Sequence, residues 1–555
     1  MKLLSSSQKV DFKNCRSPSA GDFNDVDAVQ LHSYQPTRDA ENSALSGDSG
    51  QQLYNAEVYG SLRRGGVVKF FSIDCLGLAA ATFSSTFSIE CICGVLRPML
   101  SVHFGLTPAE IAASQRLVQM PLVLSFFFGL LSDCYPIMGL RRKGYMLAGL
   151  ALTVLSVFII AGLDAYVASL HDNPSGSLAA VVIAFAVLAT TGNAISYVCI
   201  HTRVIELCQR EPIGLRGSIQ ASYLVFRCIV FIITDACVYA VNSSGDASSP
   251  PYPTALVVFG IIIALPTPVI VRSWKEKCYS LSTPMKTRGQ ILWRVMQQKA
   301  VWSILLFMCF FTLFMGITFS GPSSVITKWA GANEDNEFMI QAINYGVIML
   351  TIIFWRYYFM NRPWRLFYAA GPILLIVSEL IVAYCVSMDK LRDRYFYRAM
   401  TVFSSISTAI EWLGAMTPLT EITHEGSEGA MVGLMLSLNY LVSIFDQTNS
   451  VGIFEGSNFY STVEVAADTS EARMDVLEAL LLNYGIHALA LIGLVFLPRH
   501  KLDTQQLRSY GGYTKGASAV IVTFAVVMFV YSLVIAAMTL IPSTSCFRIA
   551  GGSGC

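Results

Sequence analysis

The sequence predicts an all-α integral membrane protein, with two halves of six membrane-spanning helices each and one further helix near the C-terminus. Three observations predict this class. Apolar residues make up 54% of the 555 residues and charged residues only 14%, whereas a soluble surface needs about a quarter of its residues charged. Runs of about 20 apolar residues, the length that crosses a bilayer as a helix, recur along most of the chain. A long basic loop divides these runs into two sets of six.

The segment before the first apolar run, residues 1–66, is polar and rich in Ser, Asp and Gln, without a periodic apolar face. Such a composition cannot bury a core, and it predicts a disordered tail. Several acidic residues also argue against an organelle transit peptide, which is poor in acids. We expect a disordered N-terminal tail on the cytoplasmic side.

Twelve apolar runs are the predicted spans of the two halves. They lie at roughly 68–92, 111–131, 144–166, 178–200, 217–240, 254–271, 300–319, 338–358, 366–387, 399–418, 429–452 and 478–498. The N-terminal half then covers residues 67–271 and the C-terminal half covers residues 300–498. A further run at 517–541 predicts a thirteenth span, after a cytoplasmic linker at 499–516 and before a short tail at 542–555.

The orientation follows from the Lys and Arg residues of the loops, which favour the cytoplasmic side. With a cytoplasmic N-terminus, the predicted cytoplasmic connections hold most of these cations, including seven in the central loop at 272–299. The loop at 389–398 is an exception, because it places four cations on the predicted outer side. We expect a multi-pass protein of the plasma membrane with its N-terminus in the cytoplasm.

The two halves show weak internal symmetry. A cation cluster follows the second span and another, RYYFMNRPWR, follows the eighth. A polar loop precedes the fifth span and another precedes the eleventh. Related halves of this kind are typical of secondary transporters, whose substrate site lies between the halves near the middle of the membrane.

One stretch, GLLSDCYPIMGLRRKGY at 129–145, joins the second and third spans. Asp133 ends the second span, Pro136 stops the helix, and Gly139 permits a tight turn. The cations at 141–143 anchor the third span at the cytoplasmic surface, which the orientation rule alone explains. That rule does not explain Asp133, or Gly129 four residues earlier, where a neighbouring helix can approach closely.

This stretch resembles the loop G-x-x-x-D-…-R-[RK] of the major facilitator superfamily. The resemblance implies that the acid faces the start of span eleven and that the arginine faces an acid at the end of span four. The implied cytoplasmic latch consists of Asp133, Arg141, Arg142, Glu206 and Gly429. Free N–H groups at Gly429 would receive Asp133, and Arg142 would pair with Glu206. Such a latch closes the cytoplasmic side in one state and separates in the other.

A closer resemblance is to the folate–biopterin transporters, whose signature G-L-x-S-D-x-x-P-I-x-G-x-R-R-x-x-Y matches the same stretch. The matches LTPAE (106–110), GSIQASYLVFR (217–227) and EGSEGAMVGLMLSLNY (425–440) are similar to the same family. The likeness implies a major-facilitator-like arrangement of 6+6 transmembrane helices, to which the run at 517–541 adds an extra C-terminal helix. It also implies a transported folate or pterin. The sequence departs from the family at Leu122 and Ser125, where the family often has Trp and Lys.

Ionisable residues at membrane depth are costly and often functional. The candidates are Asp74, Glu90, Arg116, Arg227, Asp235, Glu379, Glu411 and Asp446. Those near span ends are equally explained by side chains that reach the interface. We expect Arg227 and Asp446 to bind the substrate, because both lie in the middle of spans beside the implied central cavity. Gln220 and Asn439 would add hydrogen bonds, and Tyr223 would stack on a flat ring.

The acids Asp235 and Asp446 are the predicted proton-coupling groups, since burial in a membrane favours protonation of a carboxylate. Asp235 has a second interpretation as a structural partner of Arg227, two helical turns away. The predicted function is proton-coupled secondary active transport of a small polar metabolite, folate-like or pterin-like, by alternating access. The alternatives are a different metabolite such as S-adenosylmethionine, or a receptor or scaffold of the same fold without transport.

Two other classes lack their usual signals. A membrane enzyme needs clustered catalytic residues, and the histidines here are scattered without a nucleophile motif. A channel usually has a repeated pore motif or a ring of like charge, which the sequence does not display. We therefore expect no enzymatic activity, no cofactor and no metal site. The expected partners are a small-molecule substrate, protons and the lipid bilayer, without nucleic acid, and the protein is expected to be monomeric.

Overall fold

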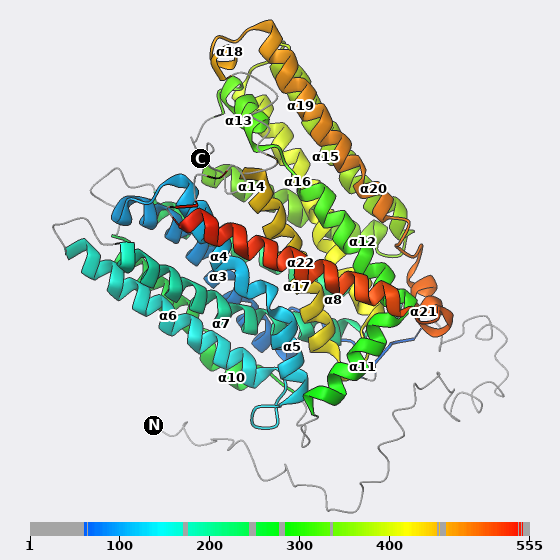
Figure 1. Ribbon diagram of the computed structural model, residues 1–555. Coiled ribbons are helices and arrows are strands. Elements are labelled where there is room, and N and C mark those ends of the chain that lie inside the picture. Colours follow the sequence, from blue (N-terminus) through cyan, green and yellow to red (C-terminus); the bar gives the residue numbers. More distant parts are fainter. Residues whose placement is uncertain are drawn as a thin grey trace, which may run out of the picture.

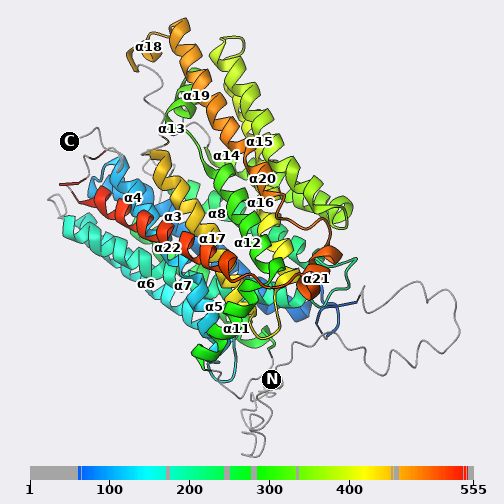
Figure 2. The ribbon, with the colours of Figure 1, turned by 45° about the vertical axis from the view of Figure 1, so that its right-hand side comes forward.

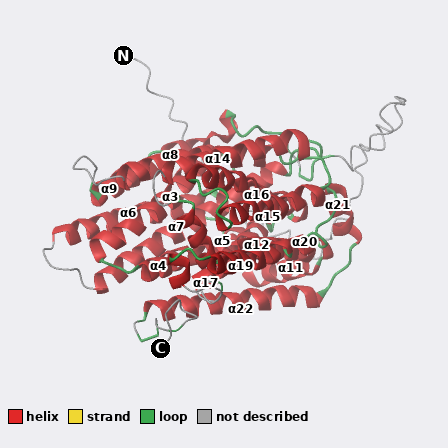
Figure 3. Ribbon diagram, turned by 90° about the horizontal axis from the view of Figure 1, so that it is seen from above, coloured by secondary structure: helices red, strands yellow, loops and turns green. Residues whose placement is uncertain are grey.

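The computed structural model describes residues 60–63, 65–169, 176–242, 251–276, 284–332, 337–451, 454, 462–541, 543–544 and 547. All regular secondary structure in these ranges is helical, as Figures 1 and 3 show. Twelve of the described helices or helix pairs are long and apolar enough to cross a membrane. The predicted all-α membrane class is confirmed. Most of the predicted N-terminal tail lies outside the described residues.

The N-terminal half contains nine elements. They are η2 (Ile73–Cys75), α3 (Leu76–Phe104), α4 (Pro108–Val123), α5 (Ser125–Cys134), α6 (Lys143–Ser169), α7 (Gly176–Cys208), α8 (Ser218–Asn242), α9 (Tyr252–Ala264) and α10 (Thr267–Ser273). The second span consists of α4 and α5, and the sixth consists of α9 and α10. Each of these two spans has a proline close to its division, Pro121 and Pro266 respectively, where a missing N–H disturbs the helical hydrogen bonds.

The C-terminal half begins with α12. Its elements are α12 (Lys299–Gly316), α13 (Ser320–Trp329), α14 (Glu337–Phe354), η3 (Trp355–Phe359), α15 (Trp364–Ser387), α16 (Arg394–Ile422), α17 (Glu428–Val451), α18 (Thr462–Ala466), α19 (Ser470–Ala488) and α20 (Ala490–Gly493). The helix of the twelfth predicted span begins at Ser470, eight residues before the apolar run predicted at roughly 478–498. Thr469 caps α19 by accepting a hydrogen bond from the N–H of Ala472, so the helix begins in the polar segment before the apolar run.

In the described part of the chain, two short helices and one long helix lie outside these halves in the sequence. Helix α11 (Met285–Gln297) occupies much of the predicted central loop, and α21 (Lys501–Tyr510) occupies much of the predicted linker. The long helix α22 (Lys515–Leu540) is the predicted thirteenth span. It packs against α17 and α4, so it bridges the two halves (Figures 1 and 2).

Helix α16 is the least apolar of the predicted spans and is not among the twelve apolar candidates. It is nevertheless 29 residues long and packs against α14, α15 and α12. Its low apolar content reflects charged residues within it, including Arg394, Arg398 and Glu411. We therefore assign α16 as the tenth span because of its length and its packing within the bundle, not because of its hydropathy.

The helix starts and crossings follow from particular residues. In the stretch LTPAE, Thr107 caps α4, Pro108 occupies its first turn, and the Glu110 carboxylate accepts a hydrogen bond from the Thr107 N–H at 2.8 Å. This reciprocal arrangement satisfies N–H groups that have no partner within the helix. At the crossing of α6 and α7, a Cβ on Gly149 would overlap the carbonyl oxygen of Gly192, and the reverse is also true. Glycines therefore set the close spacing of these helices.

The two halves meet at the face that carries the loops at 135–142, 209–217 and 423–427, which we call the latch face. Helix α17 packs there against α5, and α8 packs against α14 along the other side of the interface. Away from the latch face, α6 of one half and α19 of the other diverge in Figures 1 and 2. The halves are therefore held together mainly at the latch face.

Candidate functional site

The loop between α5 and α6 is a tight turn. Ile137 and Leu140 exchange backbone hydrogen bonds of 3.0 and 2.9 Å, and between them Met138 and Gly139 have φ angles of 54° and 77°. A two-residue turn with two left-handed residues favours glycine, which has no Cβ to clash. The turn brings Arg142, just before α6, back to the end of α5.

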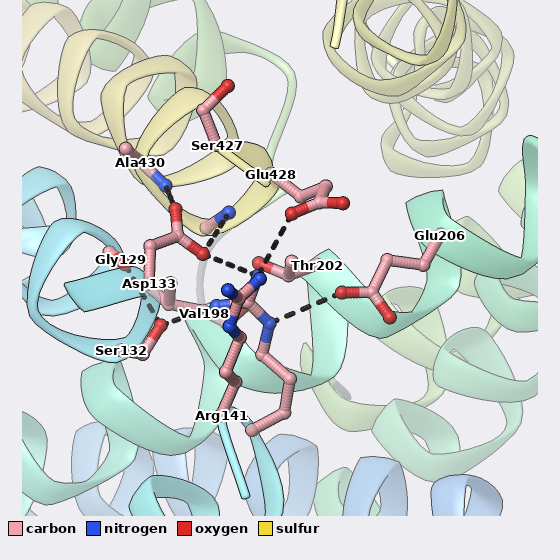
Figure 4. A network of polar contacts seen from close by, with 12 residues as sticks. Gly129, Ser132, Asp133, Arg141, Val198, Thr202, Glu206, Ser427, Glu428 and Ala430 are labelled. Atoms are coloured by element: carbon pink, nitrogen blue, oxygen red, sulfur yellow. Dashed lines mark hydrogen bonds and ion pairs between the residues drawn. The ribbon is translucent and has the colours of Figure 1, made fainter. Parts of the chain in front are cut away.

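Asp133 lies at the end of α5, is 1% exposed, and contacts the start of α17. Its Oδ1 accepts a hydrogen bond from the N–H of Gly429 at 3.3 Å, and its Oδ2 accepts one from the N–H of Ala430 at 2.8 Å (Figure 4). The first N–H groups of a helix have no partner within it, and its dipole favours a negative charge there. The contact between Asp133 and Gly429 that the sequence indicated is present, and Ala430 extends it.

Glycine on both sides permits this contact. A Cβ on Gly129 would overlap the carbonyl oxygen of Gly429, and a Cβ on Gly429 would meet the Arg142 guanidinium. One turn further along, a Cβ on Gly433 would overlap the backbone carbonyl of Ser125. The two helices therefore touch backbone to backbone, which only small residues allow.

Arg142 links acids of both halves and is 1% exposed. Its Nη2 donates to Asp133 Oδ1 at 2.6 Å, and its Nε donates to Glu206 Oε1 at 3.3 Å. Nη2 also lies 3.5 Å from Glu428 Oε2 of α17, and Nη1 donates to Ser132 Oγ at 2.6 Å (Figure 4). A buried guanidinium is stable only with its donors paired. Arg142 therefore joins α5, α7 and α17 in one charged cluster.

Two further arginines complete this cluster. Arg63 lies 2.9 Å from Glu428 Oε1, and Arg203 donates to Glu206 Oε2 at 2.8 Å. The predicted latch residue Arg141 contributes through its backbone, because its N–H donates to Glu276 Oε1 at 3.0 Å. The same carboxylate accepts from the N–H groups of the next two residues and so caps the start of α6.

A second set of contacts joins the halves beside the first. Arg216 of the N-terminal half pairs with Glu421 at the end of α16, at 2.8 Å, and both side chains are 1% exposed. Gln220, which the sequence analysis assigned to the substrate, donates to Thr420 Oγ1 at 2.5 Å and to the Met416 carbonyl at 3.2 Å. Gln220 therefore joins α8 to α16 close to the latch face.

Helix α21 adds a buried lysine to this second set. Lys501 Nζ donates to the carbonyls of Arg216 at 2.7 Å and Ile213 at 3.2 Å, and to Asn361 Oδ1 at 3.1 Å. Burial lowers the pKa of Lys501 to about 8, so the ammonium form still predominates at neutral pH. The linker after the twelve spans thereby touches loops of both halves.

Arg227 lies in the middle of α8 within a set of aromatic rings. Its guanidinium carbon is 5.0 Å from the Tyr197 ring centroid and 5.8 Å from that of Trp412, and Tyr223 and Phe231 lie within 6 Å. Nη1 donates to the Tyr197 hydroxyl at 3.0 Å. Among the described residues, Arg227 Nε has no hydrogen-bond partner and no carboxylate pairs with the guanidinium. Aromatic ring faces hold this arginine in place, and its Nε–H is available to a ligand.

Asp446 lies on α17 and is 4% exposed. Neither of its carboxylate oxygens has a hydrogen-bond partner among the described residues, and Oδ2 lies where a Cβ of residue 316 would be. Gly316 ends α12 at this point. About two turns earlier on α17, Asn439 Oδ1 accepts a hydrogen bond from Thr312 Oγ1 at 3.1 Å. Asp446 and Asn439 therefore both face α12.

The predicted site residues fall into three places. Asp133, Arg142, Glu206 and Gly429 meet at the latch face, and Tyr223 lies beside Arg227 between the halves. Asp446 and Asn439 lie in the C-terminal half. The predicted coupling acid Asp235 is half-buried on α8, and the described residues offer no hydrogen bond to its Oδ2. No group of three or more metal-ligating side chains occurs in the described part of the chain.

Several residues of these sets were not assigned from the sequence. Tyr197 and Trp412 come from spans four and ten, and only the tertiary fold brings them to Arg227. Glu276 and Glu428 lacked an assigned partner, although Glu428 directly precedes the glycine that opens span eleven. That adjacency is the one signal that the sequence offered, because an acid in the first turn of a helix commonly contacts a cation nearby.

The sequence profile of the BT1 family matches residues 90–507. A probable folate-biopterin transporter 2 of Arabidopsis thaliana is 22% identical over 347 residues, which cover 60% of this chain and 66% of that protein. A folate-biopterin transporter of Synechocystis is 20% identical over 372 residues, which cover 65% of this chain and 71% of that protein. The chain thus spans about two thirds of the length of these relatives.

Solved structures of major facilitator proteins share the fold. The proton:xylose symporter XylE has a TM-score of 0.54 at 13% identity, and the match covers 79% of this chain and 99% of that one. A bacterial homologue of the iron transporter ferroportin, in an outward-facing state, has a TM-score of 0.52 at 12% identity and covers 75% and 98%. The predicted major-facilitator arrangement is therefore confirmed at the level of the fold.

Proposed function

The chain belongs to the BT1 family, and on that premise we propose that it is a secondary active transporter of a folate-like or pterin-like metabolite, coupled to protons. It works by alternating access between its two halves. The observation that supports this proposal is the contrast between Arg142, whose guanidinium is paired with acids at the latch face, and Arg227 between the halves, whose Nε has no hydrogen-bond partner among the described residues.

Alternating access requires contacts that close one side and can separate. The latch contacts of Asp133 and Arg142 cross from one half to the other, and so does the pair Arg216–Glu421. Hydrogen bonds and ion pairs have directional, discrete geometries, so they are either made or broken by a rocking motion of the halves. We assign Asp133, Arg141, Arg142, Glu206 and Gly429 to the cytoplasmic latch.

The substrate class follows from the surroundings of Arg227. A planar heteroaromatic ring stacks favourably on tyrosine and tryptophan faces, and a carboxylate or ring carbonyl accepts two parallel hydrogen bonds from a guanidinium. Folates and pterins combine these features. Arg227 and Tyr223 form the proposed centre of the site, Asp446, Asn439 and Gln220 its proposed surroundings, and Asp235 and Asp446 its proposed proton carriers.

The orientation is the one that the loop cations favour, with the latch face and the N-terminus in the cytoplasm of a cell whose plasma membrane holds the protein. The protein is proposed to act as a monomer in the bilayer, with the halves at 67–271 and 300–498 as its moving units. A tag after residue 555 is then expected outside the cell. Tag detection only after permeabilisation would contradict this orientation.

Uptake by cells that express the protein tests the proposal. Radiolabelled folic acid, biopterin and S-adenosylmethionine serve as probes, and the variants Arg227→Ala and Arg272→Ala separate the proposed site from a surface arginine. We expect uptake of folic acid or biopterin that stops with Arg227→Ala and continues with Arg272→Ala, since Arg272 is exposed on α10. A protonophore should abolish accumulation.

Accumulation of S-adenosylmethionine alone would contradict the substrate class while leaving transport intact. Accumulation that follows a sodium gradient and ignores the protonophore would contradict proton coupling. Absence of uptake of all three probes, from a protein shown to be folded and at the cell surface, would contradict the transport function as proposed.

A further inference from the structure

We propose that a cavity at the start of α3 and the ends of α7 and α10 binds the phosphate group of an anionic phospholipid. This inference goes beyond the proposed transport, because it concerns a second ligand at a different place from Arg227. With the orientation proposed above, the cavity faces the cytoplasmic leaflet, which carries the anionic lipids of a cell membrane.

The cavity has a volume of about 210 Å³ and lies where three spans begin or end. Three cations, one acid and one tryptophan line it, namely Arg203, Arg210, Lys275, Asp74 and Trp274. The close approach of α10 to α3 forms part of its wall, because a Cβ on Gly77 of α3 would overlap the backbone nitrogen of Trp274. The cavity is therefore a basic pocket between membrane-spanning helices.

Arg210 supplies a half-buried positive charge to this cavity. Within the described residues, its guanidinium makes no hydrogen bond and no ion pair. The neighbouring acid Glu206 already accepts hydrogen bonds from Arg142 and Arg203. Burial and the nearby charges of Arg203 and Arg63 lower the pKa of Arg210 from its usual value. An anion in the cavity would offset that repulsion and stabilise the charged guanidinium.

Lys275 is the second cation that can bind such an anion. Its Nζ lies 2.8 Å from Asp74 Oδ1, and both side chains are mostly exposed. An ion pair this exposed stabilises little, so a phosphate competes with Asp74 for the ammonium group. Arg203 Nη2 donates to the Lys275 backbone carbonyl at 3.1 Å, and this contact keeps the two cations next to each other.

Exposed apolar side chains beside the cavity favour a lipid as the source of the phosphate. At the start of the first span, Phe71, Ile73 and Leu76 are exposed, and Ile73 is 85% exposed. Ile73 and Leu76 flank the cavity-lining residues Asp74 and Cys75 in the sequence. An acyl chain that packs on these apolar side chains places its headgroup at the cavity. Basic pockets between membrane helices on the cytoplasmic side bind anionic headgroups in this way.

The cavity shares Arg203 with the charged cluster of the latch face. The same guanidinium that lines the cavity donates to Glu206 Oε2 at 2.8 Å, and Glu206 Oε1 accepts from Arg142. A phosphate in the cavity therefore lies beside the contacts that join α5, α7 and α17. Its charge acts on the cation that pairs with Glu206.

Native mass spectrometry of the full-length protein in detergent tests the site. Phosphatidylglycerol is the anionic probe, and phosphatidylcholine with the same acyl chains is the probe without net charge. Wild type should bind phosphatidylglycerol more strongly, and Arg210→Ala should reduce this preference about fivefold, the usual contribution of one cation at an anionic membrane surface. The matched control Arg272→Ala removes an exposed cation that does not line the cavity, and it should keep the preference.

Asp74→Asn guards against misfolding as the cause, because it removes the competing carboxylate and should strengthen binding of phosphatidylglycerol. Equal losses in Arg210→Ala and Arg272→Ala, or no gain in Asp74→Asn, would overturn the proposal. Displacement of the bound phosphatidylglycerol by inorganic phosphate would contradict a lipid site and identify a free phosphate as the ligand. A preference for phosphatidylglycerol in a protein that takes up neither folic acid nor biopterin would reject the proposed function and keep this site.

Discussion

The latch face and the interior between the halves both bury arginine and carboxylate side chains, but these side chains have polar partners at the latch face and few in the interior. At the latch face, Arg142 uses Nε, Nη1 and Nη2 on Glu206, Ser132 and Asp133. In the interior, Arg227 donates a hydrogen bond to the Tyr197 hydroxyl and rests on aromatic faces. Asp446 makes none within the described residues. Paired charges stabilise one conformation, whereas unpaired charges at membrane depth are candidate binding sites for a substrate or a proton.

Arg227→Ala should give the largest effect, because it removes the one interior cation that the described aromatic cluster surrounds. Binding of radiolabelled folic acid to the solubilised protein should weaken at least about 30-fold, which corresponds to about 2 kcal/mol, the lower range for loss of a buried charged contact. Arg227→Lys should recover part of the affinity, since lysine keeps the charge and lacks the planar fork. Equal affinity in wild type and Arg227→Ala would remove Arg227 from the site.

Gly429→Ala tests the latch face and should give the next largest effect. The added Cβ would meet the Arg142 guanidinium and the Gly129 carbonyl oxygen, so the latch face should open more often, by about 1.4 kcal/mol or tenfold in population. Cys134, buried beside Asp133, reports the opening through its rate of reaction with N-ethylmaleimide, measured by mass spectrometry. Gly346→Ala is the matched control, because a Cβ there meets no atom within 4 Å. Equal rates in both variants would contradict the role of Gly429.

Asp468→Asn should have the smallest effect, because Asp468 and its partners Arg392 and Arg473 lie on the face opposite the latch face. Hydrogen bonds from Arg392 and Arg473 hold the pKa of Asp468 well below its usual range. A lowered pKa gives stability above the unfolded value, about 3.9, that is lost as pH falls below it. With a third of its side chain exposed, the expected loss of thermal stability at pH 7 is about 1 kcal/mol or less. The difference from wild type should begin to shrink between about pH 5 and pH 3, and a difference of equal size at both pH values would contradict the ion pairs as its cause.

Local signals in the sequence were sufficient for most spans and for the core of the latch. Apolar runs locate helices in a bilayer because lipid accepts few charges. Gly129 indicated a close helix contact, and the resemblance to the major facilitator loop implied the ion pair of Arg142 with Glu206. Both contacts are present. Their gating role stays a prediction.

Features that depend on distant segments were not predictable in the same way. The backbone of the break between α12 and α13, after Gly316, finds its hydrogen-bond partners, His487 and Asn483, on α19, which is far away in the sequence. Helix α11 lay within the predicted central loop, although apolar residues at 291–292 and 295–296 gave it a helical period among its cations. The aromatic surroundings of Arg227 come from three helices, so no local pattern records them.

The most direct test of the whole account compares binding and transport in Asp133→Asn. This substitution keeps the shape of the side chain and removes the charge that caps α17 and pairs with Arg142. The closed latch should weaken by about 1–3 kcal/mol, so transport of folic acid or biopterin should fall about 5- to 150-fold, while binding to the solubilised protein changes less than about twofold. Loss of binding in a folded, correctly inserted Asp133→Asn protein would contradict the account, because the latch would then belong to the substrate site.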